Sequence, residues 1–210
     1  ASFAGQQESF LNISGKEELL EACKKCFASL FTDRAIVYRY DQQFDYKKIA
    51  LSVVIQKMVR SDKGSSGVAF SLDTESGFKD VVVINASYGL GDAIVQGLVV
   101  PDEYVVFKPT LSKGFTPIRK KEIGSKKTKT VYRSTGTEQA SVPSSLQSQQ
   151  CINDQEILEI SKAVCIIENL YSEEKGSWCP MDVEWAKDGI DNLIYIVQAR
   201  PETVHAQHTN

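Results

Sequence analysis

Helical spacing of apolar residues marks two segments of the chain. In Lys16–Phe31 apolar residues recur every three or four positions, and Ser14 with Glu17 resembles a capping box at its start. Asp154–Tyr171 has the same spacing. Both segments are expected to form amphipathic helices, and a shorter apolar helix is expected at Asp92–Leu98.

Runs rich in β-branched residues predict the strands. Ala50–Val59 is typical of a buried strand, and further strands are expected at Val68–Leu72, Val81–Asn85 and Tyr104–Lys108. Near the end of the chain, Val183–Trp185 and Leu193–Val197 predict a hairpin that turns at Asp188–Asn192.

Two polar segments complete the pattern. Thr116–Arg133 predicts a two-stranded ribbon around Gly124–Ser125, and Thr135–Gln150 predicts a surface loop or linker. Strands and helices therefore follow one another with short connections. This order predicts an α+β fold with a largely antiparallel sheet and flanking helices.

Composition limits the classes of function. The chain has 210 residues, 42% of them hydrophobic, enough for one large domain or two small lobes. A net charge of −3 argues against a general nucleic-acid binder. No apolar run approaches membrane length and no signal peptide is visible, and five scattered cysteines suggest reduced thiols in a cytoplasmic protein. Because it opens on ASFAGQQ, we expect a fragment of a longer protein.

The predicted C-terminal hairpin carries the strongest candidate chemistry. Asp182 and Glu184 are two residues apart and share a face of one strand, as Gln198 and Arg200 do on its partner. Carboxylate and amide oxygens suit Mg²⁺, and a fixed guanidinium suits a phosphate oxygen. Spacing alone, however, favours an exposed hairpin with cross-strand ion pairs.

Resemblance to a known family changes that balance. The segment MDVEWAKDG…LIYIVQARPETV resembles the end of the ATP-grasp domain in the family of phosphoenolpyruvate synthases, pyruvate phosphate dikinases and rifampicin phosphotransferases. The same family is indicated by ASFAGQQESFLN, VVIQKMV…GVAFSLD, NASYGLGDAIVQGLVVPDEYVVFKPTL and IRKKEIGSKKTKTVY, in this order. The segments KPTL and RKKEIGSKKTKTVY favour its synthase branch.

The resemblance implies the roles of the hairpin residues. Glu184 and Gln198 would bind magnesium, and Arg200 would bind the triphosphate of ATP. Glu184 and Arg200 would thus serve catalysis, while Asp182 would bind the metal or support its ligands.

The resemblance also implies the rest of the ATP site. Gly5 and Gln6 would lie in a phosphate loop, and the purine would bind a hinge formed by Gln56, Lys57, Met58 and Val59. Asp92, where the family usually has glutamate, would lie near the ribose. From their own pattern these segments read as a plain turn, a core strand and a helix start.

For the whole protein, the resemblance implies the C-terminal lobe of an ATP-grasp fold. Residues 1–15 would be a phosphate-loop segment of the N-terminal lobe, 16–205 the nucleotide-binding portion and 206–210 a tail. The parent would convert ATP, pyruvate and water into AMP, phosphoenolpyruvate and phosphate, with a phosphohistidine domain, a pyruvate-binding barrel and a possible homodimer. The fragment alone would be inactive.

Two other functions and two local features stay open. An antibiotic phosphotransferase of the rifampicin type would share the ATP-grasp ending, and a non-catalytic module could retain the fold. The basic segment Arg119–Arg133 reads mainly as a solvated ribbon, with phosphate steering or domain contact as the alternative. Cys23 and Cys26 form a lone CxxC, which favours packing over zinc.

Overall fold

The computed structural model describes residues 8–45 and 48–203. The chain divides into two compact units. The smaller unit comprises residues up to Met58 together with Tyr132–Thr137, and the larger comprises Val59–Val131 and the chain from Glu138 onwards. In the described part of the chain, no helix is both long and apolar enough to cross a membrane.

The smaller unit contains two helices where one was expected. Helix α1 (Lys16–Ala28) is followed by a 3-10 turn, η1 (Ser29–Phe31), and by α2 (Asp33–Asp41). The helix predicted over Lys16–Phe31 is thus confirmed up to Ala28. The first helix ends here because a new helix begins at Thr32. The side chain of Thr32 accepts a hydrogen bond from the backbone N of Ala35, and this bond caps α2.

The capping box predicted for α1 is wrong. The residue at the N-cap is Gly15, which has no side chain to accept a hydrogen bond. The backbone N–H of Ser14 donates instead to Glu18 Oε2, at 3.0 Å. The glutamate that closes the helix start is therefore one residue later than expected.

The strand predicted at Ala50–Val59 is also wrong. These residues have no regular secondary structure, and Val54 and Ile55 are 82% and 66% exposed. A β-branched run becomes a strand only where a neighbouring strand accepts and donates its hydrogen bonds. No strand in the described part of the chain pairs with this run.

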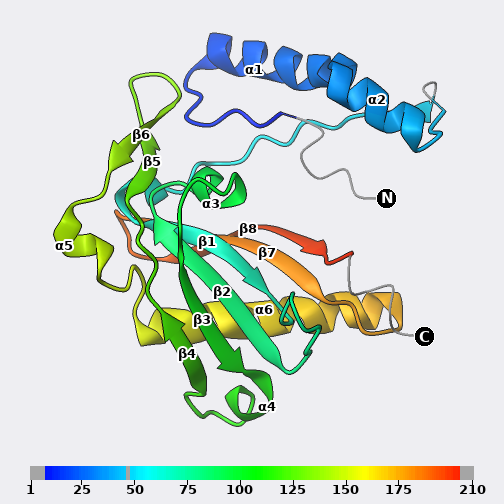
Figure 1. Ribbon diagram of the computed structural model, residues 1–210. Coiled ribbons are helices and arrows are strands. Elements are labelled where there is room, and N and C mark those ends of the chain that lie inside the picture. The colour runs from blue at the N-terminus through cyan, green and yellow to red at the C-terminus, as the bar shows by residue number, and fades with distance from the viewer. Residues whose placement is uncertain (1–7, 46–47, 204–210) are drawn as a thin grey trace. The chain divides into compact units, whose positions relative to one another are not determined.

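The larger unit is built on a six-stranded sheet with the order β4-β3-β2-β1-β7-β8 (Figure 1). All neighbouring strands are antiparallel, which confirms the predicted α+β class. The strands are β1 (Ser65–Phe70), β2 (Val81–Tyr88), β3 (Asp102–Phe107), β4 (Ile118–Glu122), β7 (Met181–Lys187) and β8 (Ile194–Pro201). The strands predicted at Val68–Leu72, Val81–Asn85 and Tyr104–Lys108 are thus confirmed with shifted ends as β1, β2 and β3, and the predicted hairpin is β7–β8.

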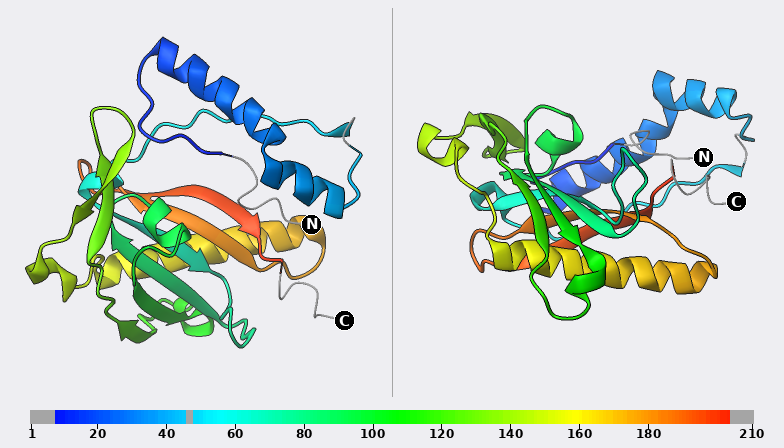
Figure 2. Two further views of the ribbon diagram at one scale, coloured as in Figure 1. Left: turned by 45° about the horizontal axis from the view of Figure 1, so that its top comes forward. Right: turned by 60° about the horizontal axis from the view of Figure 1, so that its bottom comes forward.

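Helix α6 (Asp154–Lys175) covers one face of this sheet (Figures 1 and 2). It begins at a capping box formed by Asn153 and Glu156 and ends at Gly176, which has a positive φ of 71°. Its apolar stripe packs on alternate residues of the strands, and the buried members of this core include Ile157, Ile160, Val164, Val82, Ile84, Val106 and Val183.

The opposite side of the sheet is called here the second face. Because side chains alternate along a strand, it carries the residues between those of the core. They include Val68, Phe70, Val83, Asn85, Glu103, Asp182 and Glu184.

Two short elements, η3 (Ser61–Lys63) and α3 (Asp92–Val95), pack near one end of β1 and β2. Helix α3 is shorter than the predicted Asp92–Leu98.

The predicted ribbon at Thr116–Arg133 is wrong. Strand β4 pairs with β3, whereas β5 (Thr128–Tyr132) pairs with β6 (Thr137–Ser141) in a separate two-stranded sheet. The supposed loop Thr135–Gln150 thus contains β6 and the short helix α5 (Ser144–Gln147). The reason is that Gly124 and Lys126, on either side of the exposed Ser125, are buried and held by Asp102, so this segment does not form a hairpin turn.

Asp102 is the buried group that holds residues 124–126. Its Oδ1 accepts hydrogen bonds from the backbone N of Gly124, at 2.9 Å, and from Lys126 Nζ. Its Oδ2 accepts from the hydroxyl of Tyr104 and from the backbone N of Cys151, both at 3.0 Å. The side chains of Asp102 and Lys126 are both 0% exposed. Four groups therefore satisfy one buried carboxylate.

Lys126 joins this network to the chain before α6. Its Nζ also donates to the carbonyl oxygens of Gly124, at 2.9 Å, and Gln147, at 3.1 Å. Its three donor positions are therefore filled.

The same network affects Cys151. Burial, followed by the negative charge of Asp102, raises the pKa of the Cys151 thiol well above its usual range.

A second buried ion pair fixes the far end of α6. Lys108 begins α4 (Lys108–Leu111), and its Nζ donates to both carboxylate oxygens of Glu168, at 2.9 and 2.7 Å. Glu168 also accepts a hydrogen bond from Trp178 Nε1 at 2.9 Å, and Lys108 donates to the carbonyl of Ser71. The KPTL segment is thus a structural anchor between the sheet and α6.

We predict that Lys126→Met destabilises the larger unit by about 3–5 kcal/mol, because Asp102 would stay buried without its counter-charge. The exposed neighbour Lys127 provides the matched control, and Lys127→Met should change stability by no more than about 0.5 kcal/mol. Urea unfolding followed by tryptophan fluorescence measures both, since Trp178 and Trp185 lie in this unit. Equal effects of the two substitutions would contradict the structural role of Lys126.

Candidate functional site

The hairpin β7–β8 presents the predicted site residues together. Asp182 pairs with Arg200 and Glu184 with Gln198 in the strand register. The register then shifts, so that Trp185 pairs with Ile196 and Val197 is an extra residue in β8. The four polar side chains therefore lie on the second face of the sheet.

The extra residue Val197 decides which face each part of β8 shows. With strict alternation, Ile194 and Ile196 would share a face with Gln198 and Arg200. The bulge exchanges the faces, so Ile194 packs against the core under α6 while Gln198 and Arg200 face the other way. The spacing of residues in β8 carries no signal of this bulge.

Arg200 is held by Asp182 and not by Glu184. Its Nε lies 2.7 Å and its Nη2 lies 2.6 Å from Asp182 Oδ2. The Asp182 side chain is 13% exposed, whereas that of Arg200 is 41% exposed. The guanidinium is therefore fixed at its base and still presents donors to solvent.

Glu184 is left with an uncompensated charge. Among the described residues its carboxylate has no hydrogen bond or ion pair, although the side chain is partly buried. Burial raises the pKa of Glu184, Arg200 opposes this rise, and Asp182 adds to it. A partly buried carboxylate without a partner favours binding of a cation.

The donor set fits a hard divalent cation. Glu184 offers carboxylate oxygens, and the amide of Gln198 on the paired position of β8 makes no hydrogen bond to the described residues. Mg²⁺ commonly takes one or two protein oxygens and completes its shell with water and substrate phosphates. Within the described ranges no group of three His, Cys, Asp or Glu residues could form a protein-only metal cage.

Asp182 is the residue that contacts Arg200 directly. Its Oδ2 is occupied by two donors of Arg200, so one carboxylate oxygen remains. The geometry favours Asp182 as the residue that positions Arg200.

Of the predicted hinge, Gln56 and Lys57 are exposed, while Met58 and Val59 are partly buried. The boundary between the two units falls between Met58 and Val59. Of the four hinge residues, only Val59 is therefore in the larger unit, which contains the sheet.

The chain directly after Val59 is fastened to the turn of the hairpin. The backbone N of Arg60 donates to Asp188 Oδ2 at 3.0 Å, and the backbone N of Gly189 donates to the Arg60 carbonyl at 3.1 Å. The backbone hydrogen bond from Arg60, followed by that from Ile190, lowers the pKa of Asp188. Val59 is thereby fixed beside the turn end of the hairpin that carries Glu184. Sequence reasoning did not identify Arg60 or Asp188.

Three predicted site residues remain, Asp92, Gly5 and Gln6. Asp92 begins α3, and its Oδ1 is buried without a hydrogen-bond partner in the described structure. Gly5 and Gln6 lie outside the described residues.

The basic segment is largely neutralised by its own surroundings. Lys120 pairs with Glu103 and Glu122, at 2.8 and 2.7 Å, and Lys121 pairs with Asp154 at 2.5 Å. Arg119 stacks over the ring of Phe107, with 5.7 Å to its centroid. With Lys126 buried, most of these cations are engaged within the larger unit. This favours the structural interpretation over phosphate steering.

The comparison with known families agrees with this geometry. A family described as "Pyruvate phosphate dikinase, AMP/ATP-binding domain" matches residues 1–210. The chain therefore belongs to this family of nucleotide-binding domains.

Named relatives make the comparison more specific. The chain is 58% identical over 210 residues to phosphoenolpyruvate synthase of Aquifex aeolicus, covering 99% of this chain and 24% of that protein. It is 56% identical to the protein of the same name from Synechocystis, covering 99% and 26%, and 49% identical to that of Escherichia coli, covering 99% and 26%. It thus spans about a quarter of the length of these relatives.

We predict that Arg200→Ala lowers the free energy of unfolding by only about 1 kcal/mol, because the ion pair is partly exposed and screened by solvent. Urea unfolding measures this value, with the exposed Arg34→Ala as a control for loss of a surface arginine. A loss as large as that expected for Lys126→Met would mean that Arg200 is mainly structural.

Proposed function

We propose that the chain is the ATP-binding part of a phosphoenolpyruvate synthase. In this proposal the intact protein transfers phosphate from ATP to a carrier histidine, and pyruvate, ATP and water yield phosphoenolpyruvate, AMP and phosphate. The observation that carries the proposal is the unpartnered carboxylate of Glu184, next to Gln198 and to an Arg200 held in place by Asp182. Family membership and the names of the relatives support it.

The hairpin would hold Mg²⁺ and one side of the triphosphate. Glu184 and Gln198 would supply metal ligands, and the bound metal would neutralise phosphate charge as it develops in the transition state. Arg200 would donate hydrogen bonds to a phosphate oxygen through the donors that Asp182 leaves free. Asp182 would orient the guanidinium, with its second oxygen available to a metal-bound water.

Roles for the rest of the nucleotide rest on the family resemblance. We propose that the purine meets Gln56, Lys57, Met58 and Val59, largely through backbone groups. Gly5 and Gln6 would contact the β- and γ-phosphates. For Asp92, a ribose contact would have to use Oδ2, because Oδ1 is buried.

The rest of the parent protein would complete the reaction. Residues 1–15 would belong to the phosphate loop of the N-terminal lobe, and 16–205 would form the nucleotide-binding portion. The parent would add the remainder of that lobe, a phosphohistidine domain and a pyruvate-binding barrel. We propose that the intact protein is a cytoplasmic enzyme of gluconeogenesis and that it can form a homodimer.

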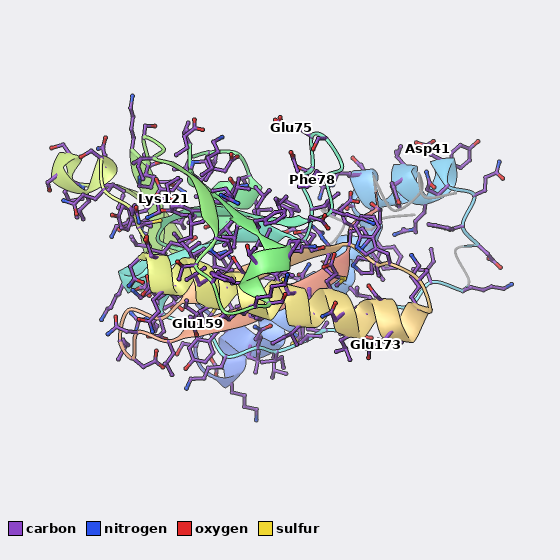
Figure 3. The ribbon with its side chains drawn as sticks, turned by 90° about the horizontal axis from the view of Figure 1, so that it is seen from below. Asp41, Glu75, Phe78, Lys121, Glu159 and Glu173 are labelled. Atoms are coloured by element: carbon purple, nitrogen blue, oxygen red, sulfur yellow. The ribbon has the colours of Figure 1, made fainter. Side chains whose placement is uncertain are left out.

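We predict that Glu184→Gln in the full-length protein weakens Mg-dependent ATP binding by roughly 100-fold, because the neutral amide removes the charge that holds the metal. Isothermal titration with ATP, with and without Mg²⁺, measures this effect. Glu159→Gln is the matched control, since Glu159 is exposed on α6 (Figure 3). Unchanged Mg-dependent affinity in Glu184→Gln would exclude the hairpin as the metal site.

Acid should weaken Mg·ATP binding through Glu184. Its pKa is raised, first by burial, so the carboxylate takes up a proton at higher pH than an ordinary glutamate with a pKa of about 4.3. Protonation removes the charge that binds Mg²⁺, and affinity should fall as pH decreases through this raised pKa. Titrations at several pH values measure the fall.

The matched Glu184→Gln protein isolates this effect, because titration of the nucleotide itself is common to both proteins. Its remaining affinity should lack the component due to Glu184. Parallel pH profiles in the two proteins would contradict the assignment.

A further inference from the structure

A row of paired residues runs across the second face of the sheet from the hairpin to β3. Gln198 pairs with Glu184, Glu184 with Val68, Val68 with Asn85, and Asn85 with Glu103. Neighbouring strands are about 4.8 Å apart, so Asn85 lies roughly 10 Å from Glu184 along this row. That span is comparable to the length of a nucleotide between its outer phosphates and its ribose.

Besides the proposed metal ligands Glu184 and Gln198, Asn85 is the polar side chain in this row that remains available to a ligand. The side chain of Val68 is apolar, and Glu103 is bonded to Lys120 at 2.8 Å. The amide of Asn85 is partly buried and makes no hydrogen bond within the described ranges, so its donors and acceptor are free. Its neighbours in β2, Ile84 and Ala86, are 0% exposed in the core, which fixes β2 and the direction in which Asn85 points.

Charge identifies the part of a nucleotide that suits this position. On the strands beyond Asn85, Lys120 of β4 is already neutralised by Glu103 and Glu122. A phosphate at Asn85 would therefore lie beside Glu103, and Lys120 would not be free to neutralise it. The hydroxyl groups of a ribose are neutral, and an amide can both donate to them and accept from them.

The two ends of the nucleotide would lie on either side of the middle of β1. The phosphates would lie at Glu184 and Arg200, and the purine would lie at Val59, which is fixed beside the turn end of the hairpin. The ribose would lie between these points beside β1, the strand next to β2. Asn85 is the direct neighbour of Val68 on β2.

We propose that Asn85 binds the ribose hydroxyls of the nucleotide. This inference rests on the proposed function, because it assumes that the hairpin holds the metal and phosphates of Mg·ATP. Asp92, the residue that the family resemblance places near the ribose, has one buried oxygen and lies at the start of α3. Asn85 would supply the contact that this shortened side chain does not.

The test compares ATP with 2′,3′-dideoxy-ATP, which lacks both hydroxyls, in the full-length protein with Mg²⁺. Wild-type protein should bind ATP roughly tenfold more tightly than the dideoxy nucleotide, the effect of about one hydrogen bond. Asn85→Ala should weaken ATP binding to the level of the dideoxy nucleotide and leave binding of the latter unchanged. Isothermal titration measures all four affinities.

Three variants make the result specific. Asn169→Ala, at an exposed position of α6, should keep the wild-type preference. Glu184→Gln should weaken both nucleotides equally and keep their ratio. Asn85→Leu keeps the branched shape of the side chain without its polar groups and should behave like Asn85→Ala, so the test stands even where the alanine variant fails to fold.

Two kinds of failure are distinguishable. If wild-type protein binds Mg·ATP but Asn85→Ala and Asn85→Leu retain the preference for ribose, the inference is wrong and the proposed function survives. The same holds if wild type shows no preference, or if Asp92→Ala abolishes it and the Asn85 variants do not. If wild-type protein does not bind Mg·ATP at all, the proposed function fails and the inference fails with it.

Discussion

The buried ion pair between Asp102 and Lys126 is the constraint on which the larger unit depends. Through one carboxylate it joins the start of β3, the chain at Gly124 and the backbone before α6 at Cys151. Lys126 adds the end of α5 through the Gln147 carbonyl. Burying a charge is costly unless it is fully paired, so these segments must assemble together. Helix α6 is thereby fixed against one face, and the other face is left for polar chemistry.

The second face acquires its function from register. A shift of one residue in an antiparallel strand moves every side chain to the other side of the sheet. In β8 the bulge at Val197 makes this change within one strand, so the same strand supplies Ile194 to the core and Arg200 to the site. The core and the site can therefore use one hairpin without competing for the same face.

The site was predictable where local pattern and structure agree. The residues of the hairpin, α6 and β1 to β3 follow from periodicity, and the spacing of Asp182 and Glu184 already implied a shared face. Lys126 was not predictable, because a lysine in a basic segment is usually solvated and its burial requires the distant Asp102. The exposed run at Ala50–Val59 failed for a related reason, since a strand depends on a partner that local sequence does not contain. The bulge at Val197 left no compositional signal.

The balance of charge on the hairpin is compatible with the proposed metal and phosphate site. Asp182 and Arg200 neutralise one another, while Glu184 keeps a net negative charge in a partly buried position. A cation at Glu184 removes that unfavourable charge and creates a positive centre beside the free donors of Arg200. A phosphate can then bind both, although neither could hold it as firmly alone. Because the sheet continues from this centre over apolar Val68 to the free amide of Asn85, the same face can accommodate the uncharged remainder of a nucleotide.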